Sequence, residues 1–377
     1  MSSNQEQGSL HSQASEGKRR QHGSQTAQRG VDQADDAKQQ QHQELEHDGQ
    51  VVQPEPIADD ADSALGDEIS VYTASVRESI YDFPERYGRT YHAYKEGRYS
   101  LPNDEVEMDR LDVHHHVILL AMQKQLFFAP LPADFSGRAL DLATGTGIWP
   151  IDFACQFPNA TVIGNDLSPT MPLIVPPNCH FYVDDIEADW TYSENEKFDF
   201  IHARFLAGAI ADWPKLMAQS FEHLKPGGWV EFQDWNTWIY SQDGSLPPES
   251  ALNRFHALTC GGRHAQGFNM RPGPHLEKWI QDAGFVDVEV TKVLLPLGSW
   301  PKAQQQKELG VFNLVQMMKG AEAVCLAVLP MLPPEAGGPW ELEEIQVFLA
   351  DIRKDMSNRK IHGVYDFWIV WARKPEA

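Results

Sequence analysis

The residues best suited to chemistry are small and acidic ones that alternate between positions 141 and 147. Asp141, Ala143, Gly145 and Gly147 occupy every second position there, between an apolar run and an expected helix. Glycine allows the backbone to turn sharply and lets a ligand approach the main chain. The helix that follows would present unpaired N–H groups and a positive dipole end to an anionic or carboxylate group. Since an ordinary strand-to-helix turn looks similar, the turn by itself is weak evidence for a site.

Acids also end the next two expected strands. Asp166 ends the stretch 161–166, and Asp185 ends the stretch 181–185. In a doubly wound sheet, ligands bind outside the carboxyl ends of the strands. The carboxylate of Asp166 suits a ribose, because it can accept hydrogen bonds from both hydroxyls and would repel a 2′-phosphate. Asp185, or the amide of Ile186, would contact the edge of an adenine, whereas Asp184 is expected to be solvated or to cap a turn.

The glycine spacing narrows the class of nucleotide. A dinucleotide site favours the pattern G-x-G-x-x-G, in which a pyrophosphate sits on the turn. Here Trp149 and Pro150 follow soon after the second glycine, and no G-x-x-x-x-G-K-[ST] sequence occurs. The sequence therefore predicts a nucleoside ligand that lacks a pyrophosphate.

A parallel sheet would bring these residues together, and the apolar runs predict one. Strands are expected at 139–142, 161–166, 181–185, 198–202 and 229–232, with helices at 148–156 and 212–224. Strands that alternate with helices form a parallel, doubly wound sheet. The later elements are a helix over 274–283, strands over 285–295 and 365–371, and helical segments within 301–355 around a Pro/Gly-rich break at 330–339. We expect an α/β fold with a doubly wound, seven-stranded, mainly parallel sheet.

The segments before the sheet differ sharply in composition. Residues 1–70 contain no Phe, Trp or Tyr and are rich in Gln, Ser, Asp and Glu, so we expect a disordered polar tail. Residues 71–135 would form an N-terminal cap, with tyrosines and basic residues interleaved from Tyr81 to Tyr99 and a helix from an Asn103 N-cap to about Phe128. Residues 136–377 would contain the sheet, with 301–355 as a helical insertion before its last strand.

Composition disfavours several classes of function. The formal net charge of −23 argues against direct binding to nucleic acid or to an acidic membrane, since both need Lys and Arg. No apolar run approaches the roughly 20 residues that span a bilayer. Four scattered cysteines without a CxxC pair indicate reduced thiols. We therefore expect an intracellular protein, in the nucleus or the cytoplasm, and the short basic cluster Lys18-Arg19-Arg20 does not decide between them.

A run of three histidines, His114-His115-His116, lies inside the first expected helix. Adjacent residues of a helix point about 100° apart, so the three side chains cannot all reach one metal ion. We expect no metal site in this chain.

The same residues resemble a known family. The stretch from Asp141 to Trp149 resembles the first motif, D-x-G-x-G-x-G, of class I S-adenosylmethionine-dependent methyltransferases. The chain is similar in particular to the fungal LaeA-type methyltransferases, which regulate secondary metabolism. The similar segments are 87–94, 109–112, 141–149, 198–204, 212–214 and 224–229. Ala143 departs from the family pattern, because it stands where the first glycine is normal, and it fits only if φ is negative or strain is tolerated.

This resemblance implies a Rossmann-like fold, S-adenosylmethionine as cofactor, and a set of residues that bind it. The residues implied around the methionine part are Asp141, Ala143, Thr144, Gly145, Gly147 and Ala203. Asp166 would bind the ribose hydroxyls, and Leu167 would pack against the adenine. Asp185 and Ile186 would contact the adenine amine. Tyr91 would close over the cofactor from the cap.

Methyl transfer from a sulfonium is an in-line displacement, so the protein must mainly position the nucleophile and exclude water. A general base is needed only when the acceptor must lose a proton, and His202, Asp234 and His92 are weak candidates for it. Aromatic residues that follow or belong to the fifth strand would form a wall for a flat acceptor: Trp229, Trp235, Trp238 and Tyr240. The regions 236–275 and 296–360 would shape the acceptor pocket.

Three functions stay open at this point. The leading one is a methyltransferase that acts on a small-molecule or protein acceptor in fungal secondary metabolism, with regulatory proteins as further partners. The second is a non-catalytic regulatory scaffold that keeps the fold, supported by Ala143 and the long polar tail. The third is an NAD-dependent oxidoreductase, which is disfavoured by the glycine spacing and by the lack of a Tyr–Lys pair for hydride transfer.

Overall fold

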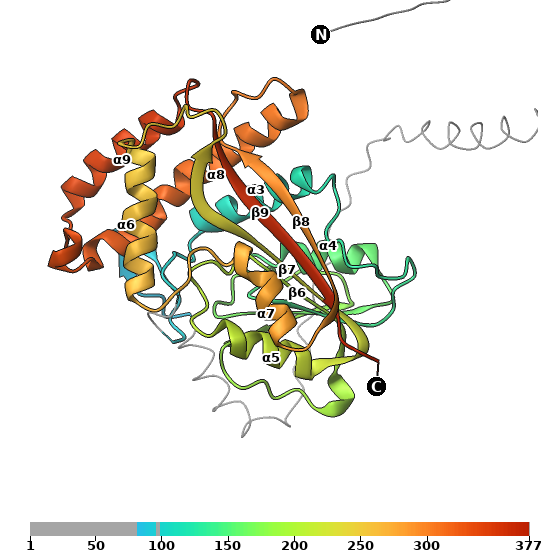
Figure 1. Ribbon diagram of the computed structural model, residues 1–377. Coiled ribbons are helices and arrows are strands. Elements are labelled where there is room, and N and C mark those ends of the chain that lie inside the picture. Colours follow the sequence, from blue (N-terminus) through green and yellow to red (C-terminus); the bar gives the residue numbers. More distant parts are fainter. Residues whose placement is uncertain (1–80, 96–98, 377) are drawn as a thin grey trace, which may run out of the picture. The chain divides into compact units, whose positions relative to one another are not determined.

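In the computed structural model, which describes residues 81–95 and 99–376, seven strands form one sheet in the order β5-β4-β3-β6-β7-β9-β8 (Figure 1). The strands are β3 (Arg138–Leu142), β4 (Thr161–Asp166), β5 (Cys179–Val183), β6 (Phe198–Arg204), β7 (Leu224–Ser241), β8 (Val286–Pro296) and β9 (Gly363–Arg373). The first five are parallel to one another, whereas β9 lies antiparallel between β7 and β8. The predicted α/β fold with a seven-stranded, mainly parallel sheet is confirmed. The expected tail over residues 1–70 lies outside the described residues.

Strand order reverses at β3, which pairs with β4 on one side and with β6 on the other. Leu140, Leu142, Phe200 and Ile201 of β3 and β6 are fully buried, as is typical of parallel strands covered on both faces. The carboxyl ends of β3, β4 and β6 therefore meet at one edge of the sheet. This edge is where a doubly wound sheet binds its ligand.

Three of the connecting helices match their predicted places: α4 (Ile148–Gln156), α5 (Trp213–His223) and α7 (Leu276–Asp282), the last preceded by the 3-10 turn η2 (Gly273–His275). Helix α5 begins after Asp212, whose side chain accepts a hydrogen bond from Lys215 N at 2.9 Å. Helix α6 (Ala251–Ala265) was not predicted. Its sequence contains two consecutive glycines and lies in a region that carries no clear periodicity.

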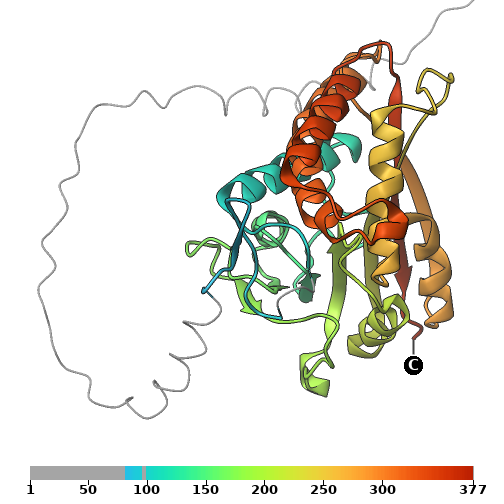
Figure 2. The ribbon, with the colours of Figure 1, turned by 90° about the vertical axis from the view of Figure 1, so that its left-hand side faces the viewer.

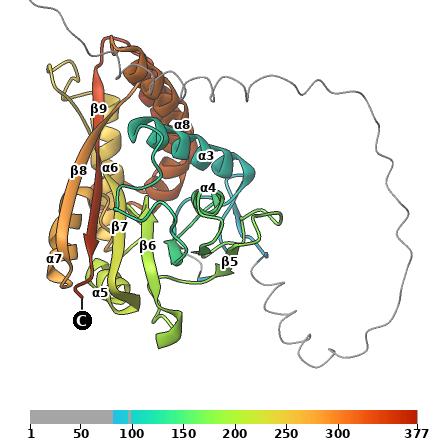
Figure 3. The ribbon, with the colours of Figure 1, turned by 90° about the vertical axis from the view of Figure 1, so that its right-hand side faces the viewer.

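Helix α3 (Glu105–Ala121) is shorter than predicted at both ends. Its N-cap is Asp104 and not Asn103, because the Asp104 side chain accepts from Glu107 N at 3.0 Å. It ends at Ala121 although apolar residues continue to Phe128, since Gln123 and Lys124 adopt φ values of 55° and 67°. The helix passes between α8 and α4 (Figure 3).

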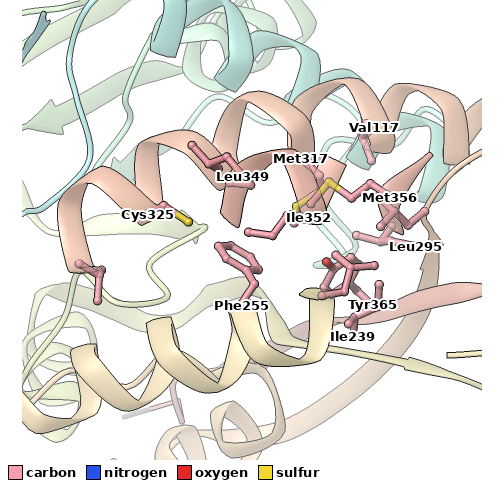
Figure 4. Close-up of a cluster of buried hydrophobic side chains, with 14 of the residues drawn as sticks. Val117, Ile239, Phe255, Leu295, Met317, Cys325, Leu349, Ile352, Met356 and Tyr365 are labelled. Carbon is pink, nitrogen blue, oxygen red and sulfur yellow. The ribbon is translucent and has the colours of Figure 1, made fainter. Parts of the chain in front are cut away.

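Two helices fill the predicted helical insertion: α8 (Gln304–Val328) and α9 (Leu342–Met356), with the 3-10 turns η3 (Leu329–Met331) and η4 (Pro334–Ala336) between them. Together with α6 they gather at the end of the long strands that is farthest from the C-terminus (Figures 1 and 2). Their apolar side chains, with those of α3 and the ends of β7, β8 and β9, form one buried cluster. Figure 4 shows Phe255 of α6, Met317 and Cys325 of α8 and Leu349 of α9 meeting in it.

By length and composition, the stretch 304–331 that contains α8 is apolar enough to cross a membrane, with a mean hydropathy of 1.4 in its most apolar part. We expected no apolar segment to approach the length that spans a bilayer, and by length and composition this expectation was wrong. Charged residues, among them Lys307 and Glu322, interrupt the stretch. Leu309, Ala321 and Leu326 are buried in the cluster just described, as in a helix of a protein core.

The segment before α3 folds over the start of that helix. A short hairpin pairs β1 (Glu85–Arg86) with β2 (Arg89–Thr90). Arg89 Nη2 donates to Asp104 Oδ1 at 2.8 Å, and Asn103 N donates to Thr90 O at 2.8 Å. These contacts join the segment to α3, as expected of an N-terminal cap, while the boundaries placed at residues 71 and 136 stay predictions.

Candidate functional site

The turn after β3 has a left-handed backbone at every second residue. The φ angle is 52° at Ala143, 59° at Gly145 and 78° at Gly147. A Cβ on Gly147 would lie 2.7 Å from Cζ of Phe181, so this position offers neither the conformation nor the space for a side chain. At Ala143 the left-handed conformation is strained, at a cost of roughly 1–2 kcal/mol.

Asp141 connects this turn with β6. Its Oδ2 accepts a hydrogen bond from Thr144 Oγ1 at 2.6 Å, and its Oδ1 lies 2.6 Å from His202 Nδ1. The His202 ring stacks on Trp149, with ring centres 3.8 Å apart. Burial lowers the pKa of His202, although Asp141 counters this effect. The buried Nε2 of His202 has no hydrogen-bond partner among the described residues, so a neutral imidazole nitrogen stays available there.

Both carboxylate oxygens of Asp166 accept backbone N–H groups at the end of β4. Oδ2 accepts from Gly145 N at 2.8 Å, and Oδ1 accepts from Ser168 N at 3.0 Å. A carboxylate offers about four lone-pair sites in all, so Asp166 keeps acceptor capacity for a ligand hydroxyl. Burial raises the pKa of Asp166, and the N–H donors oppose this rise. Asp166 is therefore a pair of acceptors whose orientation the turn fixes.

Asp185 follows β5 and is paired with a cation from the cap. Lys95 Nζ forms an ion pair with Asp185 Oδ2, and Glu187 N donates to Oδ1 at 2.9 Å. The side chains of Leu167 and Ile186 line the same cavity. The ion pair brings the cap over the carboxyl end of β5, next to apolar side chains that suit a flat base.

A chain of hydrogen bonds that was not predicted crosses the site. Arg204 Nη2 lies 2.6 Å from His115 Nδ1, and His115 Nε2 lies 3.1 Å from Asp152 Oδ2. Because a guanidinium can only donate, His115 must accept at Nδ1 and donate from Nε2 to Asp152. Burial lowers the pKa of Arg204 to about 10, which leaves it charged at neutral pH. Its buried Nη1 has no hydrogen-bond partner among the described residues, so the site holds a cation with an unused donor.

One cavity joins these groups at the carboxyl ends of β3, β4, β5 and β6, and it encloses about 1130 Å³, including open solvent. The predicted residues that line it are Asp141, Ala143, Thr144, Gly145, Asp166, Leu167, Asp185, Ile186, His92 and His202. The lining also includes residues that the sequence did not single out as cofactor-binding, among them Tyr99, Asn103, Leu111, His115, Ser168 and Arg204. Ser168 and Arg204 directly follow the predicted Leu167 and Ala203, whereas the other four come from the cap and α3 and meet the turn only through the tertiary fold.

Three residues predicted to bind the cofactor lie outside the lining of this cavity. Gly147 is the last residue of the turn and precedes α4. Ala203 is buried within β6, where it pairs with Leu142 of β3. Tyr91 is buried with the guanidinium carbon of Arg86 5.5 Å from its ring centre, while Tyr99 and His92 of the same segment reach the cavity.

The base candidate Asp234 also lies outside this cavity. Its carboxyl group accepts hydrogen bonds from Leu206 N at 2.7 Å and from Trp235 N at 2.8 Å. Burial raises the pKa of Asp234 to about 8. Asp234 is thus bound to backbone N–H groups. Of the three candidates for a general base, only His202 and His92 line the cavity.

The three consecutive histidines have three different surroundings. His114 stacks on Phe205 with ring centres 3.7 Å apart, His115 contacts Arg204, and His116 is exposed with its edge against Phe312. Within residues 81–95 and 99–376, no three His, Cys, Asp or Glu side chains are grouped in a way that could hold a metal ion.

Comparison with known proteins gives consistent matches. Residues 113–290 match a methyltransferase domain family. The chain is 40% identical over 325 residues to the methyltransferase pytC of Aspergillus terreus, a match that covers 85% of this chain and 97% of pytC. It is 34% identical over 294 residues to the secondary metabolism regulator LAE1 of Cochliobolus heterostrophus, a match that covers 77% of this chain and 94% of LAE1. It is 36% identical over 299 residues to the protein-methionine methyltransferase laeA of Emericella nidulans, a match that covers 78% of this chain and 77% of laeA.

These matches agree with the family that the sequence resembles and with the fold. The methyl donor of this class of methyltransferase is S-adenosylmethionine, and a methyltransferase also needs a methyl acceptor. The chain belongs to the fungal LaeA-type methyltransferase family.

Proposed function

We propose that this protein is an active S-adenosylmethionine-dependent methyltransferase of fungal secondary metabolism, which methylates either a metabolite or a protein that regulates metabolite synthesis. The names of its relatives support both acceptor classes, since they include a methyltransferase, a secondary metabolism regulator and a protein-methionine methyltransferase. We place it in the nucleus or the cytoplasm, where a fluorescent fusion would show it.

The observation that carries this proposal is the carboxylate of Asp166 at the end of β4. Gly145 N and Ser168 N fix its two oxygens, and it lines the cavity beside the turn. A pair of fixed acceptors at this edge of a doubly wound sheet suits the two hydroxyls of a ribose. The residues present therefore fit a nucleoside.

The other end of the cavity fits an amino acid. Arg204 is a partly buried cation whose buried Nη1 keeps an unused N–H donor, and a guanidinium recognises a carboxylate well. We assign it to the carboxylate of the methionine part. Leu167 and Ile186 would contact the adenine, with Asp185 near its amine, as the resemblance implied.

S-Adenosylmethionine, when bound, supplies a methyl group on a positively charged sulfur. A lone pair of the acceptor forms the new bond to the methyl carbon while the carbon–sulfur bond breaks and its electron pair stays on the sulfur. This chain then has to orient the two partners and exclude water. An acceptor that carries a proton would release it to water or to a neutral imidazole, and His202 and His92 line the cavity.

Two variants test the site together, with calorimetric titration of S-adenosylhomocysteine and of 5′-methylthioadenosine, which lacks the amino acid part. Asp166→Asn should weaken both ligands at least about tenfold, because both carry the ribose. Arg204→Gln should weaken only S-adenosylhomocysteine, by about 10- to 100-fold, the usual range for a lost charged hydrogen bond. Unchanged 5′-methylthioadenosine binding by Arg204→Gln also shows that this variant is folded.

The control is Asp282→Asn, which changes an exposed aspartate of α7 that pairs with Lys278 and should bind both ligands like wild type. If wild type binds neither ligand, the proposed function is wrong. If Asp166→Asn binds both as well as wild type does, the ribose assignment fails.

A non-catalytic scaffold is the second candidate, and the strained Ala143 is the observation that favours it. Such a scaffold would bind S-adenosylhomocysteine but would not transfer a methyl group to any acceptor. Incubation of the protein with methyl-labelled S-adenosylmethionine and fungal metabolite or protein extracts separates the two candidates. Label transferred to any extract component rules out the scaffold.

A further inference from the structure

A second cavity adjoins the first and belongs to the extra helices. It encloses about 740 Å³, including open solvent, and most of its lining comes from α3, α6, α8, β7, the segment that follows β6 and the cap residues just before α3. Both cavities are lined by the side chains of Tyr99, Leu111 and Phe205. Many of its lining residues come from the regions 236–275 and 296–360, which the sequence predicted to shape the acceptor pocket.

Phe205 lies at this boundary in a strained conformation. Its φ angle is 62°, in the left-handed region that a bulky residue rarely adopts, and its N donates to Gln233 O at 3.1 Å. Its ring stacks on His114 at a tilt of only 15°. Backbone strain of this kind is found where the surrounding structure must hold a side chain in one place, often at a site.

The charges around the second cavity are balanced. Arg110, which lines it, donates to Glu107 at 2.6 and 2.9 Å and to Gln316 Oε1 at 3.1 Å. Burial lowers the pKa of His256 to about 3, and His256 Nε2 lies 3.1 Å from the hydroxyl of Tyr365. The Arg110 guanidinium is thus paired with a carboxylate and the His256 ring is neutral, so the cavity suits an uncharged occupant.

One polar atom at this cavity lacks a partner. His114 is only 2% exposed, and its Nε2 has no hydrogen-bond partner among the described residues. Burial holds the pKa of His114 well below its usual value, so the ring is neutral and its nitrogen can donate or accept. A buried polar atom without a partner is costly, and a bound ligand would satisfy it.

Only one of the four aromatic residues predicted to form a wall for the acceptor lines the second cavity. Trp235 lines the second cavity, with its ring centre 5.3 Å from that of His114. Trp229 packs in a different core cluster, Tyr240 donates its hydroxyl to Asp366, and Trp238 lies under Arg271. The flat surface for an acceptor therefore comes from Trp235 and Phe205, and not from the whole predicted wall.

We propose that the second cavity holds the methyl acceptor, and that this acceptor is an uncharged aromatic small molecule with a polar atom bound to His114 Nε2. The inference rests on the proposed function for its donor and adds the acceptor class. The aromatic Phe205, Trp235 and Phe255, with the aliphatic parts of α8, would contact its rings. His114 is a positioning residue in this arrangement.

The test uses the full chain saturated with S-adenosylhomocysteine and the probe 2-naphthol, titrated by calorimetry. Its charged relative 2-naphthoate should bind at least about tenfold more weakly, because the cavity offers no free cation. Gly320→Leu fills the cavity, since Gly320 lines it and a Cβ there would meet nothing closer than Arg110 Cδ at 3.5 Å. We expect this variant to lose at least about tenfold in 2-naphthol affinity.

Gly320→Leu should not unfold the protein, because leucine favours helix formation more than glycine does. The matched control is Gly261→Leu on α6, an exposed helical glycine with open space around it, which should bind the probe like wild type. Equal S-adenosylhomocysteine affinity in all three proteins isolates the effect to the second cavity. Equal 2-naphthol affinity in wild type and Gly320→Leu, or no binding to wild type, overturns the acceptor site alone. No S-adenosylhomocysteine binding to wild type overturns the proposed function as well.

A second variant tests the hydrogen bond. His114→Phe keeps an aromatic ring but removes Nε2, so 2-naphthol should bind about fivefold more weakly while naphthalene, which has no hydroxyl, should bind unchanged. A purely structural role for His114 would weaken both probes equally and would overturn the assignment. Stronger binding of N-acetylmethionine methylamide than of 2-naphthol would also overturn the proposal, because it points to a protein side chain as the acceptor.

Discussion

Ala143 is both the departure from the family pattern and a strained residue in the turn. Its φ of 52° suits glycine, yet the neighbouring contacts hold it in place. Ala143 N lies 3.3 Å from Asn165 Oδ1, Thr144 N donates to Asn165 O at 2.8 Å, and Gly145 N donates to Asp166. A strained conformation persists when its surroundings determine it from several sides in this way. The alanine therefore costs stability without changing the bonds that orient Asp166.

We expect Ala143→Gly to stabilise the protein by about 0.5–1 kcal/mol, since glycine removes the left-handed strain but adds some flexibility to the unfolded chain. Urea unfolding measures this change, and S-adenosylhomocysteine affinity should not fall. The control is Ala283→Gly, where φ is −76° and no strain exists to relieve, so stability should drop. If Ala143→Gly lowers stability as much as Ala283→Gly does, the strain argument is wrong.

At the scale of elements, the parallel half of the sheet could be predicted because each strand is short, apolar and bounded by turn residues. The strands β3 and β4 lie where their apolar runs placed them, within one residue. Asp141 lies near the end of β3 and Asp166 ends β4, so the edge of the sheet that forms the site could be predicted as well. The periodicity and the turn residues of each unit are local signals.

Other features depended on tertiary contacts and could not be predicted. Strand β7 starts at Leu224, five residues before the expected strand, because Leu224 already pairs with Phe198 of β6. The segment Lys225–Gly228 has no pairing partner on β6 and interrupts the ladder, which resumes at Trp229. The pairing of His115 with Arg204 and Asp152 joins α3, β6 and α4, which lie far apart in the sequence. Arg204 could have been suspected only as a basic residue at the end of a predicted strand.

Strand β7 also buries two carboxyl groups whose ionisation affects stability. Burial raises the pKa of Glu231 to about 7 and that of Asp234 to about 8, from ordinary values of 4.5 and 3.8. Between the ordinary and the raised pKa, the folded protein binds more protons than the unfolded chain does. Their contribution to stability is therefore full below the ordinary values and is lost as the pH rises through the raised ones.

Glu231 and Asp234 each contribute to the free energy of unfolding. We expect this contribution to decrease as the pH rises from about 5.5 to about 8.5. Asp234→Asn cannot ionise, so its urea unfolding free energy should fall less than that of wild type over this range. The exposed change Asp282→Asn should keep the wild-type dependence. The same pH dependence in Asp234→Asn and wild type would contradict the raised pKa of Asp234.

For the whole molecule, the two cavities divide the functions between the sheet and the extra helices. The first cavity lies at the carboxyl ends of β3 to β6, and nearly all of its lining falls within or next to the matched methyltransferase domain. The second draws much of its lining from α6 and α8. Helix α3 contributes Leu111 to both. On the proposed assignment, the edge of the sheet holds the methyl donor, and α6 together with α8 of the insertion shapes a separate acceptor site.

The last prediction concerns how much of the chain the site requires. Among the described residues, 81–95 and 99–376, those that line the two cavities all lie from His92 onward, and pytC is matched over 97% of its length by 85% of this chain. Composition predicts that residues 1–70 cannot bury a core. We expect deletion of residues 1–70 to leave the melting temperature unchanged and the calorimetric affinity for S-adenosylhomocysteine within about twofold. Deletion of residues 1–104 removes His92, Tyr99 and Asn103 and should weaken binding at least about tenfold. If the short deletion weakens binding as much as the long one, the tail takes part in the site and the boundary predicted at residue 70 is wrong.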